Sequence, residues 1–357
     1  EPRMVLMSIY ASVGQFKIIL EMADEIIELA EKSDNPKYLS FGYFNRALQS
    51  FLKGLGLGSK EERHGIDDEL LEEIMLNANK ALEICEQNND MKGSLSAKNI
   101  MAISLQQAEH YQEAFLMFEE MNNIHEKIND KFGLLKNYNL IAMTYNDMGD
   151  YSNAIKYLDK ELEYYESNNK SFMGTMALYQ KIDSILKQGK NLENNYLNEL
   201  YEQGLNIVES SDAEVVTLNG LYTSMGLIKI IQEDYDSALE VLSKSSQIGK
   251  ELQAVDDTGV IDNTSATLIT YCKKMLGEDI ASILDDLEKR FENLHMDEIE
   301  AYYLYTVFDS DKGKKYLEKG FNIISDMKTH LKDKVLEEFC DAKYVKLISE
   351  AWEKVNR

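Results

Sequence analysis

Apolar residues recur every three or four positions along most of the chain, and short polar turns interrupt them. The stretch YNLIAMTYNDMGDYSNAIKYL illustrates the pattern. Tyr138, Ala142 and Tyr145 follow helical spacing before a polar MGDY turn. Ala154 and Leu158 then resume that spacing. The pattern predicts two amphipathic helices joined by a tight turn, with large and small residues sharing each apolar face.

Long polar turns recur about every 40 residues. They read EQNND, EKIND, YESNN and VESSD, and a shorter turn recurs between them as EHYQEA, GDYSNA and EDYDSA. Asn and Asp suit both kinds of turn, because they tolerate left-handed backbone and cap helices. Each period therefore predicts a helix of about 14 residues, a turn, and a second helix of about 18 residues. Stacked hairpins of this kind form a solenoid.

The order of large and small residues resembles the tetratricopeptide repeat (TPR). Small residues let the two helices of a hairpin approach closely, and aromatic residues fill the holes opposite. Two departures are a period of about 40 rather than 34 residues and Asn/Asp turns in place of the usual closing proline. The long period is similar to that of kinesin light chains and bacterial TPR regulators. The motif positions are Met101, Ala102, Tyr111, Ala114 and Phe118; Tyr138, Ile141, Ala142, Tyr145, Tyr151, Ala154 and Leu158; and Tyr222, Met225, Gly226, Tyr235, Ala238 and Leu242.

We therefore expect an all-α fold, an α-α superhelix of about eight helical hairpins with a C-terminal capping helix, in a single TPR-like domain over residues 1–357. The chain has only 2 prolines, which fits long helices. Gly204 and Gly320 occupy close-contact positions, whereas Met121, Glu161 and Ser245 stand where the motif expects alanine. The best repeats are 95–130, 135–169 and 219–256; weaker copies are 3–34, 37–90, 175–212, 260–294 and 297–328; and C-terminal helices occupy 329–357.

Net charge and cysteine content restrict the partners and the compartment. The formal net charge is −25, which argues against binding to nucleic acid or to anionic membranes. The 3 cysteines are far apart and form no metal or redox motif, as expected of reduced thiols in a cytoplasmic protein. No apolar run is long enough to span a membrane. The chain begins with Glu1 rather than Met, so we expect a piece of a longer protein with another domain before it.

Candidate catalytic and metal-binding motifs are absent from the sequence. The 5 histidines include no HExxH pair, and none of the common nucleotide-binding or nucleophile motifs occurs. The stretch KGLGLGSKEERHG (53–65) lacks the Walker spacing and joins two helices, so it is interpreted as a flexible insertion rather than a phosphate loop. We expect no enzymatic activity, no cofactor and no metal.

The resemblance to TPR arrays implies that first helices line a concave groove. Asn99 and Asn139 take the same groove position in successive repeats, and a carboxamide can bond both the N–H and the C=O of an extended peptide. Lys98 and Lys136 are candidates to hold a partner carboxylate. Met143, Leu186, Leu227 and Ile230 either make the groove partly apolar or are buried between helices. The predicted peptide-binding residues are Asn99, Gln106, Lys136, Asn139, Met143, Asn146, Tyr179 and Asp183.

Two functions fit these observations. The first is a non-catalytic protein- or peptide-binding module, the scaffold or regulatory sensor of a larger bacterial protein. The alternative is a cytoplasmic receptor for a short signalling peptide, similar to the RRNPP-type regulators of Gram-positive bacteria. Either would bind a protein or extended peptide in the groove without contacting nucleic acid or membrane, and homodimer formation is left open. A preceding helix-turn-helix would favour the receptor, and a preceding catalytic domain the regulatory module.

Overall fold

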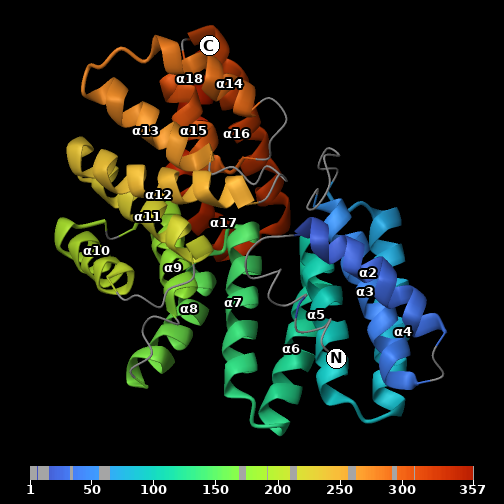
Figure 1. Cartoon of the computed structure of the whole chain (residues 1–357). Coiled ribbons are helices and arrows are strands. Elements are labelled where there is room, and N and C mark those ends of the chain that lie inside the picture. The colour runs from blue at the N-terminus through green and yellow to red at the C-terminus, as the bar shows by residue number, and fades with distance from the viewer. Residues whose placement is uncertain are drawn as a thin grey trace. The chain divides into compact units, whose positions relative to one another are not determined.

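The computed structural model describes residues 6, 16–32, 35–55, 65–168, 174–190, 192–209, 215–255, 263–291, 296–308 and 310–356. Residues 3–5, 7–15 and 33–34 of the predicted repeat 3–34 and residues 56–64 of the predicted insertion lie outside this part of the chain. Every regular element within it is an α-helix, labelled α2 to α18 (Figure 1), so the all-α prediction is confirmed.

The helices follow one another in antiparallel pairs. Their bounds are α2 (Phe16–Glu31), α3 (Pro36–Gly54), α4 (Asp68–Gln87), α5 (Met91–Gln107), α6 (Tyr111–Lys127), α7 (Lys131–Met148), α8 (Tyr151–Ser167), α9 (Thr175–Gln188), α10 (Asn194–Val208), α11 (Val215–Ile231), α12 (Tyr235–Val255), α13 (Asn263–Met275), α14 (Ala281–Phe291), α15 (Glu298–Val307), α16 (Ser310–His330), α17 (Asp333–Cys340) and α18 (Lys343–Val355).

The chain divides into two compact units. The first unit comprises residues 1–141 and 252–260, and the second comprises 142–251 and 261–357, so that the boundary falls within α7. In the first unit α2 to α6 pack consecutively, and α3 also contacts α5. The prediction of one domain over the whole chain stays a prediction.

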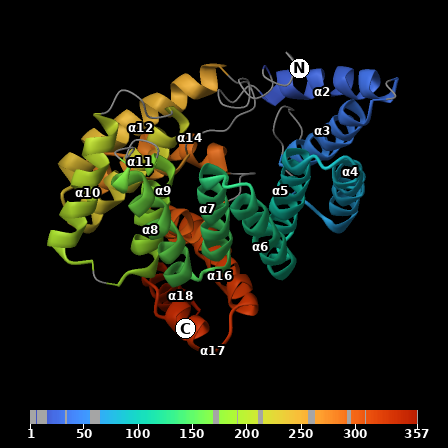
Figure 2. The same ribbon diagram turned by 90° about the horizontal axis from the view of Figure 1, so that it is seen from below.

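In the second unit, the first helices of successive hairpins pack on one another. α9 contacts α11, α11 contacts α13, and α13 contacts α15. The C-terminal helix α18 then packs against α15, α16 and α9, and Figure 2 shows α16 and α18 close together. This contact brings the last helix of the unit back to the helix near its beginning.

The recurrent turns combine a residue in left-handed conformation with a side chain that caps the next helix. Asn89 and Asn129 adopt left-handed backbone after α4 and α6, as Glu109, Gly149 and Glu233 do within hairpins. The following residue then donates its N–H to the carbonyl five positions earlier, which closes the helix in a Schellman motif. In four of these turns that same residue is an Asp whose side chain caps the next helix: Asp90, Asp130, Asp150 and Asp234.

Some first helices are longer than expected, whereas α9 has the expected 14 residues. α5 has 17 residues and α7 has 18, against a prediction of about 14. The difference arises because the caps act directly after the turn: Asp90 accepts a hydrogen bond from the Gly93 N–H, and Asp130 one from the Gly133 N–H. The helices therefore begin about one turn before the first apolar motif residue.

The motif residues form the contacts between paired helices. Ala142, Ala154 and Ala238 are fully buried, as are the large residues Leu158 and Leu242. A Cβ at Gly226 would collide with Leu242, one at Gly204 would lie 2.8 Å from Met225 Sδ, and one at Gly320 would lie 2.9 Å from Ala301 Cβ. The assignment of the glycines to close helix contacts is therefore confirmed. The variant positions Met121, Glu161 and Ser245 are also buried.

Candidate functional site

Four of the predicted groove residues lie in the first unit. Gln106 and Asn139 are buried, Asn99 is half-buried and Lys136 is exposed. The Lys136 Nζ lies over the Phe132 ring, 4.6 Å from its centroid. The other candidate cation, Lys98, donates a 2.7 Å hydrogen bond to Glu120 Oε2 and so already has an acidic partner. The role of these residues in peptide binding stays a prediction.

The other four predicted residues, Met143, Asn146, Tyr179 and Asp183, are half-buried in the second unit. The Asn146 side-chain carbonyl accepts a 2.8 Å hydrogen bond from the Ser184 hydroxyl, which joins α7 to α9. Tyr179 lies against Gly220 of α11. The apolar candidates Leu186, Leu227 and Ile230 are buried, so the alternative that helix packing covers them is correct.

Asp183 belongs to a group of charged residues that come from α9 and from the N-terminal turn of α15. Tyr179, Asp183 and Lys187 recur every fourth residue and so lie on one face of α9. The Lys187 Nζ is 3.3 Å from Asp183 Oδ2, 3.1 Å from Asp297 Oδ2 and 3.7 Å from Glu298 Oε1. One ammonium group thus connects α9 to the N-terminal turn of α15.

The N-terminal turn of α15 places three carboxylates together. Asp297 is the N-cap, and its Oδ1 accepts a 2.9 Å hydrogen bond from the Glu300 N–H. Acidic residues suit this position because unpaired N–H groups give a helix N-terminus partial positive charge. The Tyr151 hydroxyl donates a 2.6 Å hydrogen bond to Glu298 Oε1, and the Thr264 hydroxyl donates one to Glu300 Oε1. We call Asp183, Lys187, Asp297, Glu298 and Glu300 the ionic cluster.

Burial and mutual repulsion shift the pKa values of the cluster. Burial raises the pKa of Asp183 to about 6, although Lys187 opposes this. Burial, with the neighbouring Asp297, raises the pKa of Glu300 to about 8. Burial also disfavours charge on Asp297, but Lys187 and backbone N–H groups outweigh it and lower the Asp297 pKa below its usual value. Burial disfavours the charged form of Lys187 as well, yet the surrounding carboxylates raise its pKa well above the usual value.

Some side chains of the cluster are almost fully buried, and others remain partly accessible to water. The exposed fraction of the side chain is 4% for Glu298 and 12% for Lys187, but 27% for Asp183 and 41% for Asp297. Asp183 and Asp297 are therefore surrounded by protein on most sides while water still reaches their carboxylates. Three carboxylates pair with one ammonium group, and this excess of acidic groups favours further positive charge nearby.

Sequence reasoning found Asp183 and missed its partners. Tyr151 was assigned to hairpin packing alone, whereas its hydroxyl bonds Glu298. Lys187 is not among the predicted peptide-binding residues, although it lies one turn after Asp183 on α9. The sequence signal that could have found α15 is local: Asp297 precedes a helical segment and has Glu at the third position after it, as in a capping arrangement. Nothing local connects that segment to α9.

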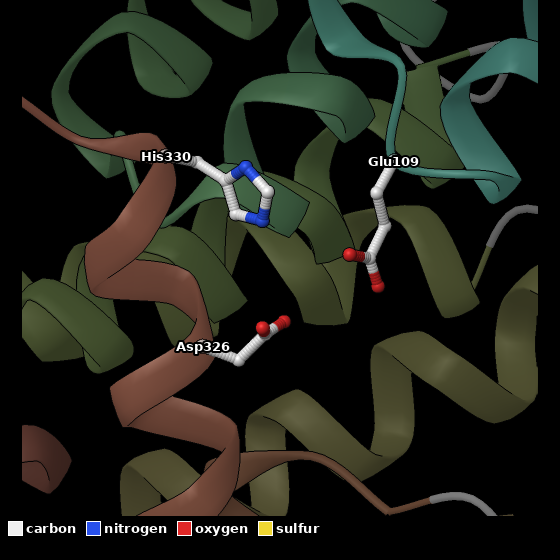
Figure 3. Close-up of side chains that lie close together, drawn as sticks. All are labelled: Glu109, Asp326 and His330. Atoms are coloured by element: carbon white, nitrogen blue, oxygen red, sulfur yellow. The ribbon is translucent and has the colours of Figure 1, made fainter.

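One further pair of potential metal ligands lies on α16. Asp326 and His330 are one turn apart, and Figure 3 shows both side chains on the same side of the helix. Glu109, also labelled there, belongs to the first unit. Two ligands on one helix are fewer than the four of a structural zinc site, so no metal site is inferred, and the expected absence of a metal stays a prediction.

Within the described residues, none of the helices is both long and apolar enough to cross a membrane. No protein-family model and no curated protein matches the sequence. Among solved structures, the chain is similar to one described as the crystal structure of Rap protein complexed with competence and sporulation factor. The TM-score is 0.53 at 12% identity, and the match covers 100% of this chain and 99% of that chain. At this identity the likeness shows the fold, a TPR-like helical repeat.

Proposed function

We propose that this chain is a non-catalytic, peptide-binding repeat protein of the long-period bacterial TPR type, acting as a regulatory or scaffolding module. The observation that supports this most directly is the ionic cluster, whose accessible carboxylates Asp183 and Asp297 come from first helices of the repeat array. First helices are the elements that pack side by side in the second unit. Their polar side chains are therefore the natural surface for an extended ligand.

The charge of the cluster indicates which ligand group it would bind. Asp183 and Asp297 present carboxylate oxygens that remain accessible to water, and both share the single ammonium group of Lys187. A guanidinium or ammonium group at this position would form charge-assisted hydrogen bonds with both carboxylates. We infer that the peptide carries a Lys or Arg side chain, or its free N-terminus, at the ionic cluster.

Neighbouring groups would bind the rest of such a peptide. Tyr179 lies one turn from Asp183 on α9, and Asn146 lies within hydrogen-bond distance of the same helix through Ser184. A carboxamide and an aromatic ring can bond and cover an extended backbone. In the first unit Asn99 and Lys136, which are half-buried and exposed, respectively, are proposed to bind the same class of ligand.

The second candidate is a cytoplasmic receptor for a short signalling peptide of the RRNPP type. One observation favours it: the structure that matches over the whole chain is of a Rap protein complexed with competence and sporulation factor. This candidate shares the binding surface with the first and differs in the ligand, which would be a free short peptide rather than a segment of a larger protein.

Fluorescence anisotropy with labelled peptides tests the proposal. The probes are two pools of six-residue peptides, identical except that one contains a single Arg and the other a single Glu. We expect the Arg pool to bind at least tenfold more tightly, and Asp183→Asn to remove that preference. Glu318→Gln, at an exposed position of α16, is the control and should retain it. Equal binding of both pools, or no binding of either, would contradict the proposed function.

A further inference from the structure

We propose that the contact between α9 and the N-terminal turn of α15 is a pH-sensitive switch, which is closed while the ionic cluster holds an extra proton and loosens when that proton is lost. The proposal concerns the conformation of the second unit and does not depend on a ligand. It stands on the geometry of the cluster, in which three carboxylates from α9 and α15 pair with Lys187 and a fourth residue, Glu300, is bonded to Asp297 through its N–H.

Within the described residues, Glu300 forms no ion pair with a lysine or arginine. Lys187 makes its three ion pairs with Asp183, Asp297 and Glu298. Glu300 instead accepts a hydrogen bond from the Thr264 hydroxyl, and its own N–H is bonded to the Asp297 carboxylate. An ionised Glu300 would therefore add negative charge directly beside Asp297, in a place that burial already makes unfavourable for charge.

The groups that face the cluster come from five helices. Besides the cluster residues of α9 and α15, three tyrosines and one threonine surround it: Tyr151 (α8), Tyr179 (α9), Thr264 (α13) and Tyr344 (α18). Burial raises the pKa of each tyrosine above its usual value, so that all three stay neutral through the physiological range. The response to pH therefore belongs to the carboxylates.

The direction of the response follows from proton linkage. The closed contact raises the Glu300 pKa from its ordinary value of 4.5 to about 8, whereas an opened, hydrated Glu300 would titrate near the ordinary value. Between pH 4.5 and about pH 8 the closed form binds more protons than the opened form does. Closure therefore becomes less favourable as the pH rises through that range. Asp183, with a pKa of about 6, acts in the same direction but only at lower pH.

Two other groups act outside this range. The pKa of Asp297 is lowered in the closed form, so its charge stabilises that form. This stabilisation is lost only as the pH falls below the ordinary pKa of an aspartate. The raised pKa of Lys187 contributes closure that is lost only under strongly alkaline conditions. From pH 6 to pH 8, Glu300 is therefore the group whose proton controls the contact.

Amide hydrogen exchange of the full chain tests the switch, with rates corrected for the intrinsic pH dependence of exchange. We expect the protection of α15 amides to fall about tenfold or more between pH 6 and pH 8.5, since one pKa unit corresponds to a tenfold change. Glu300→Gln imitates the protonated side chain and should keep α15 protected at both pH values. Glu318→Gln should behave as the wild type does.

A second variant tests the same residue in the opposite way. The Thr264 hydroxyl bond lowers the Glu300 pKa, so Thr264→Val should move the loss of protection to higher pH. Constant protection of wild-type α15, an equal loss in Glu300→Gln, or an unchanged midpoint in Thr264→Val would each overturn the proposal. Because no ligand is present, these results are separate from the peptide-binding test.

Discussion

Tyr151 and Glu298 are 147 residues apart in the sequence, and the Tyr151 hydroxyl donates a 2.6 Å hydrogen bond to the Glu298 carboxylate. Tyr151 begins α8 and Glu298 begins α15, so the bond joins early and late repeats of the second unit. Glu298 is buried, and its carboxylate also faces Lys187. The hydrogen bond therefore helps to keep a charged group inside the fold.

We expect Tyr151→Phe to lower the free energy of unfolding by about 1–3 kcal/mol, because a buried carboxylate loses a donor. Urea denaturation followed by circular dichroism measures the change. Tyr196→Phe, at a half-buried tyrosine of α10, is the matched control and should change stability by less than about 0.5 kcal/mol. Equal effects of the two substitutions would show that the hydroxyl of Tyr151 has no special role.

Lys187→Met should destabilise the protein by about 3–5 kcal/mol, because it leaves the carboxylates of Asp183, Asp297 and Glu298 without their shared cation. Lys244→Met removes an exposed lysine that pairs with Glu240 and should cost less than about 1 kcal/mol. Both changes can be measured by chemical denaturation at pH 7. A small effect of Lys187→Met would mean that the three carboxylates are stabilised without it.

The Asp183 carboxyl gives a second pH dependence that can be tested separately from Glu300. Its pKa is raised from 3.8 to about 6 in the folded protein, so the wild type should lose stability as the pH rises through this interval. Asp183→Asn cannot ionise, and its stability should vary less between pH 4 and pH 6. Thermal unfolding at closely spaced pH values makes the comparison. Parallel profiles for the two proteins would contradict the assignment.

Glu233 adopts left-handed backbone in the turn between α11 and α12, with a φ of 61°. Glycine adopts this conformation without steric cost, so Glu233→Gly should stabilise the protein by about 0.5–1 kcal/mol. Glu199→Gly, at an exposed position within α10, should destabilise it by about 1 kcal/mol. Opposite signs in thermal denaturation would verify the turn, and destabilisation by both would argue against it.

The sequence by itself determined the helices, their pairing and their turns. The reason is that these features depend on contacts between residues close in the chain: Asp90 caps the helix that follows it, and Ala154 packs within its own hairpin. The period of about 40 residues repeats these local contacts, so it is visible without a structure. The position of Asp183 on an inward helix face followed from the same periodicity.

Only the tertiary structure decided what Asp183 contacts. Its electrostatic neighbours Asp297 and Glu298 come from a distant helix, and α18 contacts both α15 and α9. In a repeat array, such long-range contacts depend on the sum of small rotations between repeats. No local pattern encodes that sum. The burial of Leu186 and Leu227 was settled in the same way, because both belong to a core cluster to which several helices contribute. A motif position specifies a helix face, while long-range packing determines whether that face binds a charge, a neighbouring helix or a ligand.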